Sequence, residues 1–438
     1  MVAEEMIKRI GPCPTLRGEI ISPGDKSISH RAAILNGIAC GKATISNFSS
    51  GADCLSTVSC LKALGVELKR ISSLPVAFEV QGVGGQGLHE AEDVLQAGNS
   101  ATTMRLLAGL LATQSFLSII SGDSSLRSRP MGRLIHPLRL MGASVWGRGG
   151  DYLAPLVIRG GELHGITYSL PVPSAQLKSA LMIAALFASG KTEIIEAAPS
   201  RDHTERLLQT MGARIEKSDR SITIIPQDIP LRSTDVCIPG DISSAAYWLV
   251  AGAIHPDARI KVRDVGINPT RTGIIDVLLQ MGARLKVENQ HWEGNEPVAD
   301  LVIESSELVS ICLSGELVPR LIDEIPLIAL AACRASGTTL IQDATELRVK
   351  EVDRISTTLK EFSKMGAKME ELPDGMLIHG GNQLHGSHCS SYRDHRLAMT
   401  LAVAGLVACG ETIIHHAEAA DVSYPNFWQD IDKLRQTA

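Results

Sequence analysis

The chain has 438 residues, of which 44% are hydrophobic, 21% are charged and only 3% are aromatic. That length exceeds what one hydrophobic core usually organises, so we expect two domains of roughly 200 residues each. The formal net charge of −6 argues against a general nucleic-acid or membrane surface. A basic site on this chain should therefore be a local pocket for a small partner.

Targeting signals are not evident along the chain. Residues 1–9 carry mixed charges where a secretory signal needs an apolar stretch, and the nine cysteines are scattered without a CxxC pair. The uncharged stretches 179–190 and 397–410 are shorter than the roughly 20 residues that span a bilayer. We expect a cytoplasmic protein with reduced thiols and buried helices in these stretches.

Two patterns that could mark a metal or a nucleotide do not fit those ligands. His379, His385 and His388 lie near Cys389, but their spacing is not that of a metal site, and we predict no metal. Segment 82–87 reads GVGGQG and satisfies GxGxxG, but a polar, broken stretch follows it instead of a helix and a well-spaced acidic residue. We therefore reject a dinucleotide site.

One unit, an Ala/Leu-rich helix followed by a small break and a short β-branched strand, recurs along the chain about every 65 to 80 residues. The six strand segments are 41–45, 115–119, 190–194, 256–260, 337–341 and 410–414. Between them, glycines that should end a helix and lead into a strand stand at Gly65, Gly142, Gly212, Gly282 and Gly366. The repetition predicts an α/β protein with three units in each of two similar domains.

The boundary between the domains is not marked by a Pro/Ser-rich linker. The midpoint 239–243 begins with Pro-Gly-Asp and is the hinge that we predict, with a second crossing near 22–26. This gives one domain of residues 1–22 and 242–438, and another of residues 23–241. A short hinge would leave a cleft between the domains, which is a usual place for ligands.

Segment 23–31, which reads PGDKSISHR, is the most informative motif. It places Lys26, Ser27 and Arg31 at the predicted start of a helix over residues 28–39, for which Ser27 would be the N-cap. The free N–H groups and the dipole of a helix start favour a phosphate or a carboxylate. The alternative is an ordinary capped helix with surface charges.

Other cations also stand at predicted helix starts or turns, each beside small or hydroxyl residues. Their segments are 99–105, 127–131, 174–178, 200–204, 348–354 and 392–396. Any one could be a surface salt-bridge cluster, but their shared position favours anion binding. Asp323 precedes an apolar run, and Glu351 lies between Lys350 and Arg354, so both carboxylates are acid–base candidates. This combination suits chemistry on a phosphorylated acid.

Together these motifs resemble the 5-enolpyruvylshikimate-3-phosphate synthase family (3-phosphoshikimate 1-carboxyvinyltransferases). The shared motifs run over nearly the whole chain: PGDKSISHR, GNSATTMR, RPMGR, SAQLK, SRDHTER, GDISSAA, DEIP, ELRVKEVDR and DHRLAM. The resemblance implies two domains of three βαβαββ units each, with an active-site cleft between them. It also implies transfer of the enolpyruvyl group of phosphoenolpyruvate to the 5-hydroxyl of shikimate 3-phosphate, in the shikimate pathway to chorismate and aromatic amino acids.

The resemblance also implies site residues, and no metal or organic cofactor. Those for shikimate 3-phosphate are Lys26, Ser27, Arg31, Ser174, Gln176, Arg201, Asp323 and Lys350. Those for phosphoenolpyruvate are Lys26, Asn99, Ala101, Arg129, Gln176, Arg354 and Arg396. By this resemblance Asp323, Glu351 and Lys26 are catalytic. Asp323 takes the proton of the attacking hydroxyl and Glu351 protonates the methylene carbon. We expect a monomer with no macromolecular partner.

Two positions depart from the pattern of many family members. Ala101 stands where many have glycine, and its methyl group should shorten the phosphoenolpyruvate pocket. With SAQLK and DEIP, this resembles the family's glyphosate-tolerant class, so we expect weak inhibition by glyphosate. Val422 stands where some members have a lysine, so no phosphate contact is assigned there.

Two rival interpretations remain open to test. The first is the sister enolpyruvyltransferase that acts on UDP-N-acetylglucosamine. It usually has a Lys-Asn-Ala-Ala motif near the N-terminus and a reactive loop cysteine, and neither is found, with no cysteine in 127–132. The second is a noncatalytic phosphate-binding relative. The presence of both Asp323 and Glu351 argues against it, because binding alone needs no paired acid and base.

Overall fold

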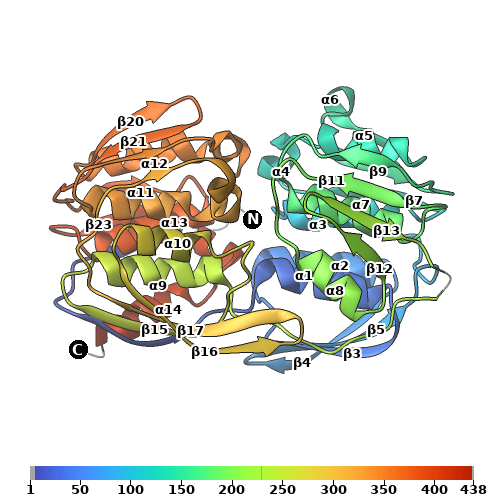
Figure 1. The fold of residues 1–438 in the computed structure, drawn as a ribbon, viewed down its shortest axis with the longest axis horizontal. Coiled ribbons are helices and arrows are strands. Elements are labelled where there is room, and N and C mark those ends of the chain that lie inside the picture. Colours follow the sequence, from blue (N-terminus) through green and yellow to red (C-terminus); the bar gives the residue numbers. More distant parts are fainter. Residues whose placement is uncertain (1–4, 228, 437–438) are drawn as a thin grey trace. The chain divides into compact units, whose positions relative to one another are not determined.

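The computed structural model describes residues 5–227 and 229–436 (Figure 1). Contacts between residues divide the chain into two compact units. The first unit comprises the chain up to Pro23, residues 239–292 and the chain from Pro297 onward. The second unit comprises residues 24–238 and the short segment Glu293–Glu296. Each unit is described by itself below.

The second unit contains short strands and helices in regular alternation. Its elements are α1 (Lys26–Gly37), β3 (Cys40–Ser46), α2 (Ala52–Ala63), β4 (Glu67–Ser73), β5 (Val76–Val83), β6 (Leu95–Gln96), α3 (Ala101–Leu111), β7 (Leu117–Ser121), α4 (Ser124–Ser128), α5 (Gly132–Leu140), β8 (Ser144–Gly147), α6 (Arg148–Asp151), β9 (Leu153–Arg159), β10 (Thr167–Ser169), α7 (Ala175–Ala185), β11 (Thr192–Ile195), α8 (His203–Thr210), β12 (Arg214–Lys217), β13 (Ser221–Ile225) and β14 (Val236–Cys237).

The first unit follows the same alternation and adds four 3₁₀ helices, η1 to η4. Its elements are β1 (Lys8–Ile10), β2 (Leu16–Ile21), α9 (Ile242–Ile254), β15 (Ala258–Gly266), α10 (Gly273–Gln280), β16 (Arg284–Glu293), β17 (Glu296–Glu304), β18 (Cys312–Leu313), η1 (Gly315–Arg320), η2 (Ile322–Glu324), α11 (Ile325–Arg334), β19 (Thr338–Ile341), η3 (Thr345–Val349), α12 (Arg354–Lys364), β20 (Lys368–Leu372), β21 (Gly375–His379), β22 (His388–Ser390), α13 (His395–Gly405), β23 (Thr412–His415), η4 (Ala417–Val422) and α14 (Phe427–Gln436).

Each unit contains three small mixed sheets with one shared pairing pattern. The six strands that the repeat predicts are all present, as β3, β7, β11, β15, β19 and β23. Each pairs in parallel with one neighbour and antiparallel with another. In three sheets the parallel or antiparallel partner comes from a distant part of the chain, namely β14, β2 and β1. The six-unit α/β fold is confirmed.

The predicted glycines end their helices for a conformational reason. Gly65, Gly142, Gly212, Gly282 and Gly366 follow α2, α5, α8, α10 and α12, and all have φ between 86° and 106°. A residue with a Cβ atom rarely adopts this left-handed conformation, whereas glycine does so at little cost. The turn reverses the chain from each helix into the strand that follows it.

Small apolar helices form the centre of each unit. In the second unit α3 packs on both α1 and α7, and in the first unit α9, α11 and α13 pack on one another (Figure 1). Every residue of α9 and of α13 is buried. Alanine and glycine let these helices approach closely, which fits the low aromatic content. The N-terminal turns of α1, α3, α7 and α13 carry cations that the sequence singled out.

The predicted N-cap of α1 is wrong. The cap of α1 is Asp25, whose side chain accepts from the backbone N–H of Ile28 at 2.9 Å. Ser27 therefore lies inside the first turn of α1. The N-terminal flank of α8 is Asp202, without a side-chain cap bond, and Ser200 bonds to Glu196 instead. Aspartate is as good a cap as serine, and a shift of two residues cannot be decided locally.

The GxGxxG segment at residues 82–87 is not followed by a helix. Gly82 lies inside β5, and no helix begins between this strand and α3 in this fully described stretch. A Cβ atom at Gly82 would lie 2.3 Å from the backbone oxygen of Ala39, so a close approach of two backbones explains this glycine.

Candidate active site

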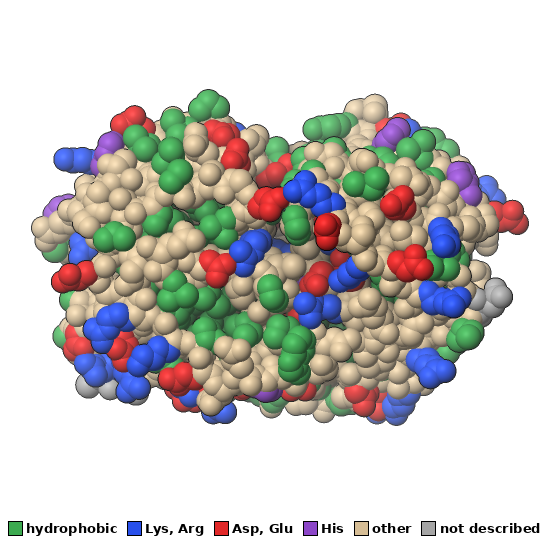
Figure 2. Space-filling view, in the orientation of Figure 1, with side chains coloured by type: hydrophobic (Ala, Val, Ile, Leu, Met, Phe, Trp, Pro, Cys, Tyr) green, Lys and Arg blue, Asp and Glu red, His purple; other side chains and the backbone are tan. Residues whose placement is uncertain are grey.

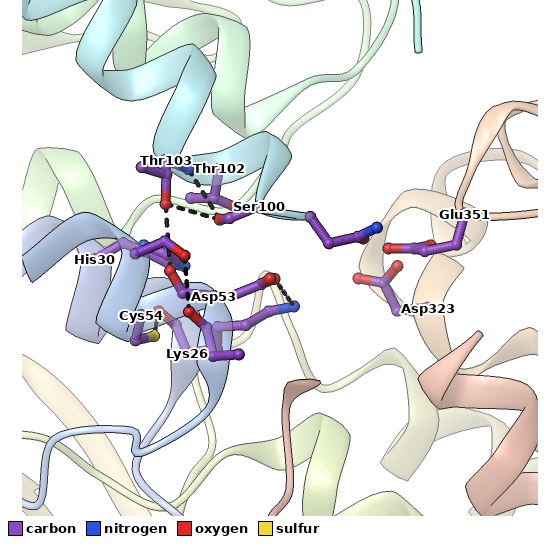
Figure 3. Close-up of polar contacts among 12 residues, drawn as sticks. Lys26, His30, Asp53, Cys54, Ser100, Thr102, Thr103, Asp323 and Glu351 are labelled. Atoms are coloured by element: carbon purple, nitrogen blue, oxygen red, sulfur yellow. Dashed lines mark hydrogen bonds and ion pairs between the residues drawn. The ribbon is translucent and has the colours of Figure 1, made fainter. Parts of the chain in front are cut away.

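The start of α1 presents a lysine and a serine in its first turn. Lys26 directs its ammonium to Asp53 of α2, with an Nζ to Oδ2 distance of 3.2 Å (Figure 3). Both side chains are largely but not fully buried, at 19% and 10% exposure. An ion pair of this kind holds Lys26 in one place while part of its charge stays available to a ligand.

Arg31, one turn further along α1, is almost fully buried. Its Nε donates to Thr204 Oγ1 at 2.6 Å, and its two terminal nitrogens donate to Ser27 O at 2.9 Å and Ser179 Oγ at 2.7 Å. The guanidinium thus ties α1 to α7 and α8. The structure places Arg31 as a link between three helix starts as much as a surface for a ligand.

The starts of α3 and α7 are joined by an arginine inside α3. Arg105 donates to Gln176 Oε1 at 2.5 Å, and Gln176 in turn donates to Thr102 Oγ1 at 2.8 Å. Ser174 caps α7 by accepting from the N–H of Leu177. These bonds fix the amide of Gln176 in one orientation. Arg105 was named in the predicted segment 99–105 but not assigned a role.

Asn99, just before α3, organises the loop that carries Arg129. Its side-chain oxygen accepts from Arg129 at 2.6 Å, and its side-chain nitrogen donates to Asp123 Oδ2 at 2.7 Å. Ala101 is the first residue of α3 and is buried, at 8% exposure. The predicted turn at 127–131 is partly helical, because α4 extends to Ser128.

A buried polar chain supports the starts of α1 and α3 from behind (Figure 3). His30 Nδ1 lies 2.6 Å from Thr57 Oγ1, which lies 2.7 Å from Thr103 Oγ1. Thr103 donates to Ser100 Oγ, the cap of α3, at 2.8 Å. Burial, with Lys26 and Arg31 nearby, holds the pKa of His30 well below its ordinary value, so the ring is neutral. Sequence patterns gave no sign of this chain.

In the first unit one arginine gathers three carboxylates. Arg354, the first residue of α12, donates to Asp394 at 2.8 Å, to Glu351 at 2.6 Å and to Asp323 at 3.4 Å. Lys350 adds a bond to Asp323 at 3.2 Å. Burial opposes the charge of Arg354, but the three carboxylates outweigh it and raise its pKa. Figure 3 shows the carboxylates of Asp323 and Glu351 side by side.

Arg396, at the start of α13, is the second buried cation of this group. It lies 3.8 Å from Glu324 Oε1 and donates to Ser243 O at 3.4 Å. Burial alone would lower its pKa, but Tyr247, Asp323 and Glu324 hold the pKa well above its ordinary value. Asp394 accepts from the backbone N–H of Arg396 as the cap of α13 and from the side chain of Arg354, so it fixes the start of α13 and the Arg354 guanidinium; the sequence did not mark it as a site residue.

The predicted residues thus fall into two clusters, one in each unit. The helix-start cluster in the second unit comprises Lys26, Ser27, Arg31, Asn99, Ala101, Arg105, Arg129, Ser174, Gln176 and Arg201. The carboxylate cluster in the first unit comprises Asp323, Lys350, Glu351, Arg354, Asp394 and Arg396. Arg201 lies directly before α8 and is half-buried.

Outside these clusters, the surface shows no large field of one charge on the face drawn in Figure 2, where basic and acidic side chains are interspersed. Among residues 5–227 and 229–436, no group of three or more His, Cys, Asp or Glu could hold a metal ion. Within the same residues, no helix combines the length and the apolar character needed to cross a membrane. The basic groups are therefore local, as the net charge predicted.

Repeated α/β units, cations fixed at helix starts and paired carboxylates define an enzyme that handles anionic substrates by acid–base chemistry. The model of the family described as EPSP synthase (3-phosphoshikimate 1-carboxyvinyltransferase) matches residues 11–431.

Similar proteins carry the same description. A 3-phosphoshikimate 1-carboxyvinyltransferase of Desulforudis audaxviator is 50% identical over 98% of this chain and 100% of the relative. One of Roseiflexus castenholzii is 51% identical over 96% and 98%. A solved EPSP synthase from Acinetobacter baumannii superposes with a TM-score of 0.87 at 39% identity and covers 98% of both chains. The chain belongs to the EPSP synthase family and is a transferase of the shikimate pathway.

Proposed function

We propose that this chain transfers the 1-carboxyvinyl group of phosphoenolpyruvate to the 5-hydroxyl of shikimate 3-phosphate and releases phosphate. The observation that carries this proposal is the carboxylate cluster, in which Arg354 holds both Asp323 and Glu351. Ion pairing alone would not need a second carboxylate beside the first. The arrangement suits a reaction in which one proton is taken up and another is delivered.

The proton steps follow from this pair. Asp323 accepts the proton of the 5-hydroxyl as its oxygen bonds to the central carbon of phosphoenolpyruvate. Glu351 delivers a proton to the methylene carbon, which gives a tetrahedral ketal with a methyl group. Loss of phosphate and return of one methyl proton to the enzyme restores the vinyl group. Lys26 stabilises the negative charge on the reacting substrates.

The other residues hold two polyanions in one reaction. Ser27, Arg31, Ser174, Gln176, Arg201 and Lys350 bind shikimate 3-phosphate with Lys26 and Asp323. Asn99, Ala101, Arg129, Arg354 and Arg396 bind phosphoenolpyruvate with Lys26 and Gln176. Two like-charged substrates in a dry site would repel each other strongly, and the cations offset that repulsion. Both clusters act on the same substrates, and we propose the two units as the two domains of the enzyme.

We propose weak inhibition by glyphosate, because the methyl group of Ala101 lies at the first position of α3, where glycine would leave more room. Ala101→Gly should therefore lower the competitive inhibition constant of glyphosate, while the KM for phosphoenolpyruvate changes little. A tight constant for the unaltered protein would contradict the proposal. So would equal constants for the two proteins.

We also propose that the protein is a cytoplasmic monomer. All nine cysteines are free, which suits a reducing compartment. Light scattering of the purified protein should give the mass of one chain, 46.8 kDa. A multiple of that mass would contradict the proposed monomer without affecting the reaction.

The test of the function is phosphate release from phosphoenolpyruvate, measured with shikimate 3-phosphate, with UDP-N-acetylglucosamine and with no acceptor. Release only with shikimate 3-phosphate supports the proposal. Release only with the nucleotide sugar would assign the chain to the sister reaction. No release with either acceptor, from protein that still binds shikimate 3-phosphate, would indicate a binding protein.

A further inference from the structure

A second charged group lies behind the helix-start cluster, in the interior of the second unit. Lys178 of α7 places its Nζ 3.0 Å from Glu196 Oε2 and 2.7 Å from Glu205 Oε1. The side chains of Lys178, Glu196 and Glu205 are 1%, 8% and 1% exposed. One lysine and two carboxylates are thus removed from water together. The sequence placed Lys178, in segment 174–178, among the cations that favour anion binding, but its burial against two carboxylates shows that this expectation is wrong.

This group is not explained by stability. Charges that leave water pay a desolvation penalty, and well-packed apolar side chains of similar volume usually serve a core equally well or better. Here two carboxylates share one ammonium, and Glu205 Oε2 is buried without a hydrogen-bond partner in the described part of the chain. A cluster with such a cost calls for a gain elsewhere, and its hydrogen bonds indicate where.

The bonds of the cluster converge on the residue before Arg201. Glu196 Oε1 accepts from the backbone N–H of Ser200 at 3.1 Å and from its hydroxyl at 2.5 Å. Lys178 donates to the backbone oxygen of Ser200 at 3.2 Å. Both backbone polar groups and the side chain of Ser200 are therefore held at once. The backbone from which Arg201 extends has little freedom at this point.

The same cluster fixes the helix on the other side of Arg201. Glu205 lies in the first turn of α8, and its bond to Lys178 ties that turn to α7. The neighbouring Thr204 Oγ1 lies 2.6 Å from Ser179 Oγ of α7. Arg201 therefore lies between two anchored points, Ser200 and the first turn of α8. Both anchors lead to adjacent residues of α7, the helix that also presents Ser174 and Gln176.

We infer that Lys178, together with Glu196 and Glu205, positions Arg201 for the phosphorylated substrate. The inference rests on the proposed function, because it takes Arg201 to bind shikimate 3-phosphate. Lys178 itself is buried and is a positioning residue, not a catalytic one. Its charge is used to fix the direction in which the Arg201 guanidinium leaves the backbone. A displacement of about 1 Å in such a group can cost a large factor in function.

The main test variant is Glu196→Gln. The amide keeps the size of the side chain but replaces one carboxylate oxygen with an NH2 group, so either Lys178 or the donors of Ser200 lose their acceptor, and the negative charge that pairs with Lys178 is lost. The KM for shikimate 3-phosphate should rise about tenfold, while kcat and the KM for phosphoenolpyruvate change less than about threefold. Lys178→Met leaves two buried carboxylates uncompensated and risks unfolding, so it serves as the second variant, measured only on protein that remains folded.

The decisive measurement is a double-mutant cycle with Arg201→Ala. If Glu196 acts through Arg201, Glu196→Gln should change the KM for shikimate 3-phosphate by less than about twofold once Arg201 has been removed. Equal fold-changes in the two backgrounds would overturn the inference. So would a lower melting temperature with all kinetic constants unchanged, which is the result expected of a merely structural cluster.

A matched control comes from the first unit. Asp300 accepts from Lys261 at 2.8 Å and is mostly buried, but both belong to β strands outside either cluster. Asp300→Asn should lower stability without changing either KM. If Arg201→Ala alone leaves the KM for shikimate 3-phosphate unchanged, the assignment of Arg201 in the proposed function fails. That outcome is distinct from additive effects in the cycle, which contradict only the positioning role.

Discussion

The arginines of the two clusters are held by different kinds of partner. Within the second unit, Arg31 donates to two hydroxyls and a backbone oxygen, and Arg105 donates to the amide of Gln176. Within the first unit, Arg354 donates to three carboxylates. Hydroxyl, carbonyl and amide oxygens orient the guanidinium groups of Arg31 and Arg105, whereas Arg354 orients the carboxylates that it binds.

The contrast indicates a division of labour. Most of the residues proposed to bind the two substrates belong to the helix-start cluster, so this cluster should determine mainly substrate affinity. Charge that is shared with carboxylates orients those carboxylates, so the carboxylate cluster should determine mainly turnover. Variants in the two units should therefore affect different kinetic constants, and the predictions below follow from that difference.

The largest effect is expected in the carboxylate cluster. Asp323→Asn keeps the shape of the side chain but removes the base that accepts the hydroxyl proton. General acid–base steps contribute roughly 10²- to 10⁴-fold, so kcat for phosphate release should fall by about that factor. The KM for phosphoenolpyruvate should change only a few-fold. Near-normal turnover would remove Asp323 from the role of base.

A smaller effect of the opposite kind is expected in the helix-start cluster. Arg129→Gln removes a charged donor that Asn99 holds in place. A hydrogen bond to a charged group is worth about 1.5–3 kcal/mol, so the KM for phosphoenolpyruvate should rise roughly 10- to 100-fold. Steady-state kinetics at saturating shikimate 3-phosphate measures this. A fall in kcat with KM unchanged would contradict the division of labour.

The third prediction concerns the neutral polar chain behind the helix starts. Thr103→Val removes the hydroxyl bonds that Thr103 makes to Thr57 and to Ser100 in a buried place and should lower the free energy of unfolding by about 1–3 kcal/mol. Thr192 is an ideal control, because its buried hydroxyl has no partner in the described part of the chain. Urea unfolding of Thr192→Val should show a change within about 0.5 kcal/mol. Equal losses in the two variants would contradict the importance of the chain.

The smallest effect is a dependence of stability on pH that arises from His30. Burial, Lys26 and Arg31 lower its pKa in the folded state, with only a weak opposing effect from Asp25. Below about pH 6.5 the unfolded chain binds a proton that the folded chain excludes, so stability falls as the pH drops, by at most about 1.4 kcal/mol per pH unit. Above that pH the contribution is constant.

The check on this prediction is the melting temperature between pH 5 and 8. His30→Asn, which keeps a polar group toward Thr57, should show a flatter decline below pH 6.5 than the unaltered protein. Parallel curves would show that other groups cause the pH dependence. The loss should be similar with and without substrates, because His30 is buried behind the helix starts.

Local features of the fold were predictable and distant pairings were not. The six strands and the glycines after five helices follow from short-range patterns, namely β-branched runs and a need for positive φ. The pairing of β1 with β23 joins residues about 400 positions apart, which no local pattern can indicate. The shift of the α1 cap from Ser27 to Asp25 has the same origin, because either residue can cap a helix.

The candidate site shows a similar limit. Motifs identified most of the cations because each stands at a helix start with small neighbours. The supporting roles of Asp53, Asp394 and Lys178 were not predicted because they arise from contacts between distant elements, and Lys178 was wrongly counted among the cations that favour anion binding. Each of these residues holds a predicted residue in place. Sequence patterns therefore predicted the residues expected to meet the substrates better than those that support them.

Deuterium transfer tests the division of labour most directly. In D₂O, the proposed ketal gains deuterium at its methyl group, so the product should carry deuterium in its methylene group. Glu351→Gln should abolish this incorporation while calorimetry shows shikimate 3-phosphate still binding within a few-fold of its normal affinity. Incorporation at a normal rate in this variant, or loss of binding together with incorporation, would contradict the assignment of proton transfer to the carboxylate cluster and of anion binding to the helix starts.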